Sequence, residues 1–296
     1  MKNNALKGSL YIALGASSYG MLATFVKIAY QQNYTTAEVT LSQYALGFLG
    51  LLILNLFQKK NSPSSSQKMG LKSTLKLIIA GSSLGLTSTF YYLSVQYIPV
   101  SAAIVLLMQT VWIGAVLETI LYRKFPNQRK IISIVLVLIG TLLAVNLIKE
   151  TAVINWKGFL YGMLAALSYT ATMYSSNNIE LHLPPLKRSL YMILGGLIVV
   201  SFIFHSSINQ EFPFGILLKW GILLSLFGTI LPPLLFTKGM PLTGMGLGAI
   251  VASVEIPVSI FIAYIWLSEP VSLLQWFGIV LILFAVVLMN LQKKII

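Results

Sequence analysis

The sequence predicts an all-α integral membrane protein with ten transmembrane helices, arranged as two inverted five-helix repeats. Three observations lead to this prediction. Hydrophobic residues make up 57% of the 296 residues and charged residues only 9%, whereas a soluble domain carries about a quarter of charged residues. Apolar runs of about twenty residues, long enough to cross a bilayer as helix, recur along the whole chain. A segment near the N-terminus also recurs in the second half.

The apolar runs define the ten predicted spans. Helices are expected because only helices and closed barrels satisfy backbone hydrogen bonds in lipid, and barrel strands would show as short alternating segments. The spans are expected at about 8–29, 36–57, 75–97, 100–122, 129–148, 157–179, 187–205, 217–238, 243–266 and 271–291. The chain has no cysteine, which excludes disulfides and thiolate chemistry.

Basic residues are divided unequally between the two sides of these spans. The side of the N-terminus carries sixteen: Lys2, Lys7, Lys59, Lys60, Lys68, Lys72, Lys76, Arg123, Lys124, Arg129, Lys130, Lys187, Arg188, Lys238, Lys293 and Lys294. The other side carries four: Lys27, Lys149, Lys157 and Lys219. Lysine and arginine accumulate in cytoplasmic loops, so both termini are expected in the cytoplasm. The net charge of +13 thus reflects membrane topology; the lipid bilayer is an expected partner, and no nucleic acid is.

The chain contains an internal repeat. Residues 7–19, KGSLYIALGASSY, return as KGFLYGMLAALSY at residues 157–169, with eight of thirteen positions identical. Residues 123–145 also resemble 268–289, and Pro99 and Pro241 each lie in the turn before the fourth span of a half. Each half, 1–148 and 149–296, therefore holds five predicted spans. Because five is odd, the second copy enters the membrane from the opposite face, and such inverted repeats build alternating-access transporters.

The arrangement resembles a known group. Ten spans as five plus five, with Ser18-Tyr19-Gly20 in the first, are similar to the drug/metabolite transporter superfamily of the EamA type. The ninth span fits with Gly248, Ala249, Ala252, Glu255 and Pro257, as does the turn Ser268-Glu269-Pro270. Two features depart from the family: Arg123-Lys124 replace an acidic turn, and Tyr19 and Tyr169 replace tryptophan. The resemblance implies export of small organic solutes, often amino acids or related metabolites, across a bacterial inner membrane.

Glu255 lies near the middle of the predicted ninth span. An ionisable residue inside the membrane is costly and usually faces a cavity or a partner. Two interpretations stay open. The carboxyl either binds substrate and couples transport to protons, or it holds a neighbouring helix by a hydrogen bond in a structural role.

The other candidate substrate-binding residues are aromatic and amide side chains in the middle of spans. They are Tyr19, Tyr91, Tyr92, Gln96, Gln109, Trp112 and Tyr169. Aromatic faces and amide tips hold an amphipathic solute by stacking, dispersion and hydrogen bonds. Tyr91 and Tyr92 face different directions, so packing is the alternative for one of them. The repeat-related Tyr19 and Tyr169 are expected to approach one central cavity from opposite sides.

Several remaining residues receive structural interpretations. Glu118 is expected to pair with Arg123 or Lys124, and Lys27 to extend toward lipid headgroups. Gly81 and Gly85 are expected to let helices approach closely, and Pro232-Pro233 to kink the eighth span. His182 and His205 lack metal-ligand spacing, so neither a metal nor a cofactor is expected.

The sequence therefore predicts a secondary transporter, an exporter of small organic metabolites such as amino acids, and not an enzyme. The alternatives are a membrane-embedded lipid-modifying enzyme or a channel. The enzyme would need clustered acids, histidine or arginine at headgroup level, and the channel a repeated charged or carbonyl-lined filter. Neither pattern is evident in the sequence. A monomer and a homodimer are both compatible with it.

Overall fold

The computed structural model describes residues 2–58, 70–98, 100–123, 125–145, 155–208, 212–268 and 270–290. All regular structure within these ranges is helical. Several residues singled out in the sequence lie outside them: Pro99, Lys124, Glu269, the loop and terminal lysines 59, 60, 68, 149, 293 and 294, and the predicted repeat boundary at 148/149.

The first half begins with α1 (Lys2–Gln31), α2 (Thr36–Phe57) and α3 (Leu71–Val95), followed by α4 (Val100–Leu107), α5 (Thr110–Tyr122) and α6 (Gln128–Ala144). Thr35 and Glu38 form a reciprocal capping box that starts α2, which satisfies two backbone donors at its N-terminus. Between α4 and α5 the helix is interrupted at Met108 and Gln109.

The second half begins with α7 (Trp156–Asn178) and α8 (Pro185–Ile203). Two π-helical turns, Leu217–Gly221 and Leu226–Ile230, flank α9 (Ile222–Ser225) and lead into α10 (Leu231–Thr243). The chain ends with α11 (Met245–Ala252), α12 (Glu255–Leu267) and α13 (Leu273–Asn290). The distortion expected at Pro232-Pro233 takes the form of the π-helical turn just before them, because prolines cannot donate to the carbonyls four residues earlier.

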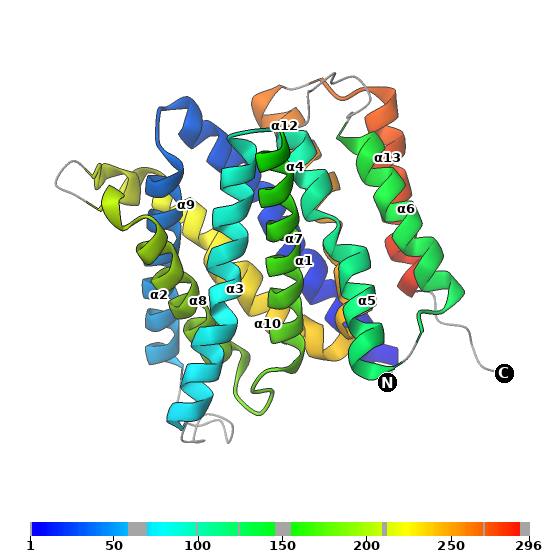
Figure 1. The fold of residues 1–296 in the computed structure, drawn as a ribbon, viewed down its shortest axis with the longest axis horizontal. Helices are drawn as coiled ribbons and strands as arrows, with labels where there is room; N and C mark the ends of the chain where they lie inside the picture. The colour runs from blue at the N-terminus through cyan, green and yellow to red at the C-terminus, as the bar shows by residue number, and fades with distance from the viewer. Residues whose placement is uncertain are drawn as a thin grey trace.

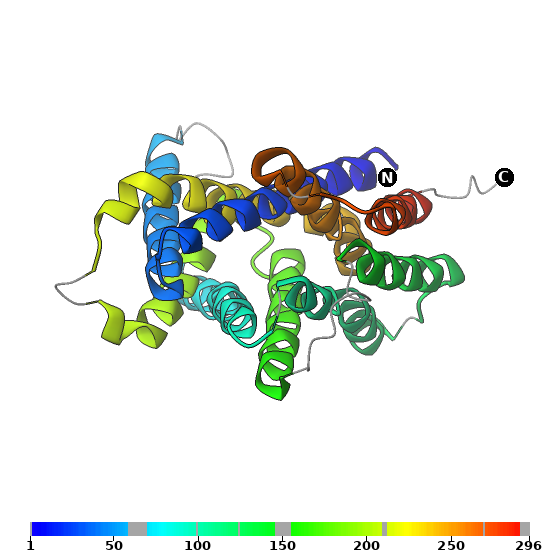
Figure 2. The same cartoon turned by 90° about the horizontal axis from the view of Figure 1, so that it is seen from above.

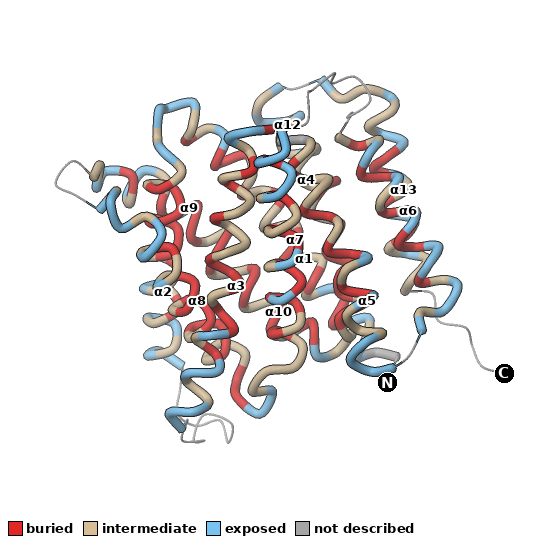
Figure 3. Tube along the Cα trace, viewed as in Figure 1, coloured by how far each residue is buried: buried red, intermediate tan, exposed pale blue. Residues whose placement is uncertain are grey.

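In the part of the chain that the structure describes, seven helical segments are long and apolar enough to cross a membrane: 4–31, 36–57, 102–122, 185–203, 217–243, 245–267 and 273–290. The predicted spans formed by α3, α6 and α7 are not among these seven, so the count of ten stays a prediction. Both α3 and α7 are rich in serine and threonine and pack extensively against other helices. Large apolar side chains such as Ile79, Leu218 and Phe277 are exposed on the outer helices (Figure 3), as expected for a surface that faces lipid.

The helices pack in a pattern that relates the two halves. Helix α1 packs along α10, and α3 packs along α7 and α8. At one end of the molecule α2 lies beside α8, and at the other α6 lies beside α13 (Figures 1 and 2). When α1, α2, α3 and α6 are exchanged for α7, α8, the segment 217–243 and α13, these contacts map onto one another; the α3–α8 contact then corresponds to that of α2 with α9 and its flanking π-helical turns.

Helices α3 and α8 pack backbone to backbone. A Cβ atom added at Gly81 would collide with the Met192 carbonyl, and one at Gly85 would lie 2.6 Å from the Gly196 oxygen. Gly195 meets the Ile78 carbonyl in the same way. The expected close approach at Gly81 and Gly85 is therefore present.

Arg188 is a buried cation on α8, with 2% of its surface exposed. It donates hydrogen bonds to the backbone oxygens of Ile179 (2.9 Å), Thr237 (3.0 Å), Ser176 (2.6 Å) and Ser175 (3.4 Å). Three of these oxygens belong to the end of α7, where the last carbonyls of a helix lack partners in the next turn; in the described ranges only the Ser175 oxygen also accepts from a backbone N–H, that of Ile179. The fourth lies four residues before Pro241, which has no N–H to give it. Arg188 thus joins α7, α8 and α10 instead of lying in a cytoplasmic loop.

Glu118 forms an ion pair with Lys130 on α6. Its expected partner was Arg123 or Lys124; the structure instead brings Lys130 to it across the α5–α6 turn. A Cβ at Gly246 would collide with both charged side chains. The glycine therefore lets the start of α11 pack on this pair.

We expect Gly81→Ala to destabilise the protein, because its methyl group meets backbone that moves only if α3 and α8 separate. Overpacking of this kind costs about 1–3 kcal/mol. Thermal unfolding of the purified protein in detergent measures the effect. Gly70→Ala is the control, since no described atom outside its chain neighbours lies within 4 Å of its Cβ position. Equal melting temperatures for the two variants would contradict the role of the close approach.

Candidate functional site

A cavity of about 480 Å³ lies among α1, α3, α4 and α12, with one or two further residues each from α2, the end of α6, α7 and the start of α13. Its lining runs from Tyr19 in the middle of α1 to Lys27 and Tyr30 near the helix end. Val271 and Gln275, beside the start of α13, line the same end. The cavity therefore extends from the middle of the molecule toward the face opposite the N-terminus (Figure 1).

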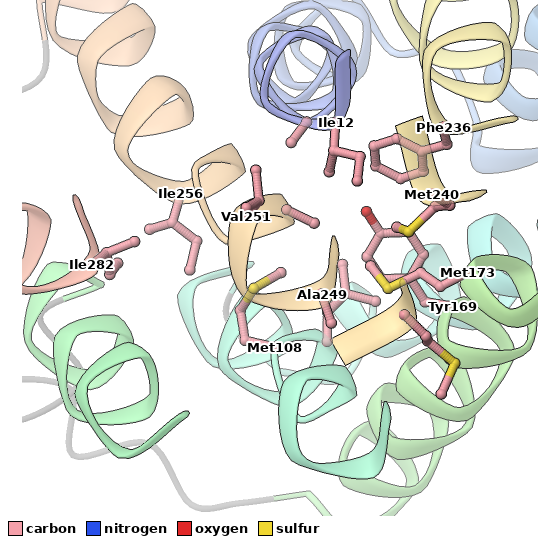
Figure 4. Close-up of a cluster of buried hydrophobic side chains, with 14 of the residues drawn as sticks. Ile12, Met108, Tyr169, Met173, Phe236, Met240, Ala249, Val251, Ile256 and Ile282 are labelled. Atoms are coloured by element: carbon pink, nitrogen blue, oxygen red, sulfur yellow. The ribbon is translucent and has the colours of Figure 1, made fainter. Parts of the chain in front are cut away.

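The cavity is closed toward the N-terminal face by a packed apolar cluster. Ile12, Phe236 and Met240 are buried there, with 0–1% of their surfaces exposed. Figure 4 shows these side chains meeting Tyr169 and Met173 between the helices. Ile12 lies two turns below Tyr19 on α1, so the cluster forms the floor of the cavity and seals one side of the molecule.

Glu255 enters the cavity because the helix breaks beside it. Pro257 has no N–H to bond to the Ser253 carbonyl, and the chain leaves α-helical geometry at Ser253 and Val254 before α12 begins at Glu255. The Glu255 carboxyl thus lies at a helix N-terminus, where the backbone dipole favours negative charge.

The carboxyl and a neighbouring hydroxyl both have unused hydrogen-bonding capacity. Tyr169 lies beside Glu255 and interacts with its carboxyl electrostatically. The Glu255 Oε2 and Tyr169 Oη atoms are buried without a partner among the described residues. Buried polar atoms of this kind are costly and are ready to bind a ligand that donates to one or accepts from the other.

Aromatic rings surround this carboxyl. Tyr19 and Tyr169 meet edge to face with centroids 6.3 Å apart, and both contact Phe236 at 5.8 and 6.4 Å. On the other wall Tyr91 and Tyr92 lie 5.9 Å apart. Tyr19, Tyr91 and Tyr169 are all close enough to interact electrostatically with Glu255. The site is thus an apolar, aromatic recess around one carboxyl.

Five of the eight predicted site residues line this cavity: Tyr19, Tyr91, Tyr92, Tyr169 and Glu255. The other three lie elsewhere. Trp112 Nε1 donates to Gln109 Oε1 at 2.7 Å, and Gln109 donates to the Val105 carbonyl at 2.9 Å, so these two satisfy one another away from the cavity. Gln96 lies at an exposed helix end within 3.5 Å of Thr36 Oγ1. A binding role for each of the eight stays a prediction.

Two further residues line the cavity, Lys27, for which the sequence suggested another role, and Gln43, which the sequence analysis did not single out. Lys27 lines the cavity, although its sequence position suggested an extension to headgroups. Gln43 lines it from α2 and accepts from the Tyr92 hydroxyl at 3.3 Å. A glutamine in the middle of an apolar span is a signal that points to Gln43, whereas nothing in the sequence gives the direction of the Lys27 side chain.

The comparisons with known proteins agree with this geometry. A family model described as "EamA-like transporter family" matches residues 6–146 and again 156–291. The chain belongs to the EamA-like transporter family. This EamA-like protein contains two family repeats, the arrangement that its sequence repeat and paired helices indicate.

Solved structures support the fold of this EamA-like protein. One, described only as a crystal structure of a protein, superposes with a TM-score of 0.76 over 97% of this chain and 97% of its own, at 13% identity. At that identity the likeness concerns the fold alone. A search of curated protein sequences finds no match to the chain.

We expect Tyr169→Phe to leave the stability of the protein unchanged or raised, because the lost hydroxyl is buried without a hydrogen-bond partner in the described ranges. Transport should fall if that hydroxyl binds substrate. Tyr44→Phe is the matched control: Tyr44 hydrogen-bonds Ser88 at 3.0 Å, so its loss should cost about 1 kcal/mol. Thermal unfolding measures the change in stability, and an uptake assay measures the change in transport. A strong loss of stability in Tyr169→Phe would show that its hydroxyl is structural.

Proposed function

We propose that this EamA-like protein is a secondary transporter that exports small organic metabolites such as amino acids, working by alternating access between two inverted repeats. One observation carries the proposal. The aromatic cavity reaches one face of the molecule and is sealed from the other by the buried cluster of Ile12, Phe236 and Met240. A recess with access to one face at a time is what alternating access requires.

Several features support inversion of the repeats. Helices α1 and α7 start at opposite ends of the molecule (Figure 1). The turns after these helices each hold a residue with positive φ, Asn33 and Glu180. Arg123 after α5 and Ser268 after α12 also have positive φ. In each half the span before this residue is interrupted near its middle, between α4 and α5 in the first half and between α11 and α12 in the second. Matching irregularities at matching positions favour two copies of one five-helix unit.

The proposed topology has ten spans, with both termini in the cytoplasm of a bacterial cell and the protein in its inner membrane. The charge asymmetry supports this orientation. The cavity would then be open to the outside in this conformation, with the floor cluster on the cytoplasmic side. A monomer or a homodimer would each carry a complete cavity.

The charges of the cavity suit a zwitterion. Glu255 at its base offers a negative group to an ammonium, and Lys27 near its mouth contributes positive charge for a carboxylate. Tyrosine faces between them would hold an apolar or aromatic side chain by stacking and dispersion. Amino acids and related metabolites combine these three features.

Counterflow in proteoliposomes tests the proposal. Vesicles loaded with one amino acid or metabolite should take up the labelled form with saturable kinetics, and a panel of such compounds identifies the substrate. Glu255→Gln should keep exchange but lose dependence on a pH gradient if the carboxyl carries the coupled proton. Unsaturable flux would favour the channel alternative, and absence of flux across the panel would favour a lipid-modifying enzyme. Unchanged gradient dependence would rule out coupling through Glu255.

The inverted topology has its own test, helped by the absence of native cysteine. We expect single cysteines at positions 7 and 157 to react with impermeant maleimide from opposite sides of right-side-out vesicles. Position 157 should react in intact vesicles, and position 7 only after permeabilisation. Labelling of both from one side would contradict inversion and the mechanism built on it.

A further inference from the structure

A second cavity, which we name the basal pocket, lies at the face where α1 begins. Its volume is about 270 Å³, and it is bounded by α1, the α7–α8 turn, the start of α8 and the end of α10. Lys7, Arg188 and Lys238 line it together with Tyr11 and apolar side chains. In this conformation the floor cluster separates the basal pocket from the central cavity.

Two lysines converge on one aromatic ring in the basal pocket. Lys7 Nζ lies 5.9 Å and Lys238 Nζ 6.0 Å from the centroid of Tyr11. They come from α1 and α10, which pack along each other. Each ammonium lies near the outer limit of about 6 Å for a cation–π contact, so the ring offsets only part of the positive charge that the two lysines bring to the pocket.

Arg188 adds a third positive charge. Its four hydrogen bonds go to neutral backbone oxygens, so its charge is solvated but not neutralised. The first residue of α8, Pro185, also lines the basal pocket, and the N-terminus of this long helix contributes partial positive charge there.

No acidic residue is found among the described residues that line the basal pocket. Glu180, in the neighbouring turn, is engaged elsewhere: it pairs with Lys76 at 3.4 Å and with His182 at 3.4 Å. Burial tends to raise the pKa of Glu180, but hydrogen bonds from Ser73 and Lys76 outweigh it and lower the pKa. The carboxylate is therefore a charged partner of α3 and not of the basal pocket.

The repeat-related position at the opposite face of the molecule lacks the second lysine of the basal pocket. At the opposite face Lys157 lies 6.0 Å from the Tyr97 ring, and Tyr161 stacks on that ring. Lys238 precedes Pro241 by three residues, and the residue that precedes Pro99 by three is Gln96. One copy of the aromatic–lysine cluster thus has a second lysine where the other has a neutral amide.

We propose that the basal pocket binds a phosphoryl anion, with Lys7 and Lys238 as its ligands and the buried Arg188 as a fixed source of positive potential. A tetrahedral, multiply charged oxyanion matches several converging cations. The membrane is the nearer source, because Leu6, Leu10 and Leu14 form an exposed apolar row on the same turns of α1. A lipid whose headgroup enters the basal pocket can lay an acyl chain along this row.

Binding to the purified full-length protein tests the proposal. The protein in detergent is titrated with phosphatidylglycerol, phosphatidylcholine and inorganic phosphate, and thermal stabilisation reports binding. Phosphatidylglycerol should bind saturably and phosphatidylcholine more weakly. Removing a lysine near a phosphate lowers affinity about fivefold; Lys7→Gln with Lys238→Gln should therefore lower it about 25-fold.

Two control variants keep the test sharp. Lys72→Gln removes an exposed lysine of the same charge-rich face outside the basal pocket and should leave binding unchanged. Lys7→Arg with Lys238→Arg keeps the charge and should retain it. Competition by millimolar inorganic phosphate would assign the pocket to soluble phosphate as well as lipid, and its failure to compete would assign it to lipid. Equal affinity in the double glutamine variant, an equal loss in Lys72→Gln, or binding of neither ligand would overturn the proposal.

Discussion

The structure depends on one constraint: inside lipid, each backbone N–H and C=O must find its partner within the protein. Four prolines at three places deep in the chain remove backbone donors from their helices, and the structure compensates for each loss locally. Pro241 leaves the Thr237 carbonyl, which accepts from Arg188. The pair at 232–233 follows a π-helical turn, where the Phe227 oxygen accepts from Ser18 at 3.0 Å. At Pro257 the helix breaks and exposes Glu255 to the cavity.

The same constraint explains where the buried charged side chains lie. Irregular backbone at membrane depth is tolerated only where it is buried in protein or lines a cavity. The break before α12 therefore lies beside the central cavity, and the uncapped carbonyls of α7 and α10 lie around Arg188. A carboxyl and a guanidinium are costly inside a membrane, and here each occupies a place that the backbone has already made polar.

The repeat and most of the helices are predictable from sequence, because apolar run length and charge asymmetry are direct consequences of lipid. The α3 and α7 helices are less apolar because their serines and threonines face protein: Ser83 hydrogen-bonds Thr172 across the two helices at 2.8 Å. Side-chain direction is harder to predict. Gln109 and Trp112 share a face as expected, but the break after α4 lets them bond one another away from the cavity. The location of Arg188 was not predicted. Its backbone acceptors lie at the end of α7 and at Thr237, four residues before Pro241, and these positions are far apart in sequence.

The duplicated KGxLY segment now has a physical explanation. A Cβ at Gly8 would lie 2.7 Å from Leu242 Cβ, and one at Gly158 would lie 2.6 Å from Ile98 Cγ2. Each glycine thus lets the first helix of its repeat pack against the third helix of the other repeat, α1 on α10 and α7 on α3. Because a Cβ at either glycine would collide with the neighbouring segment, these pairs join the two halves of the chain closely.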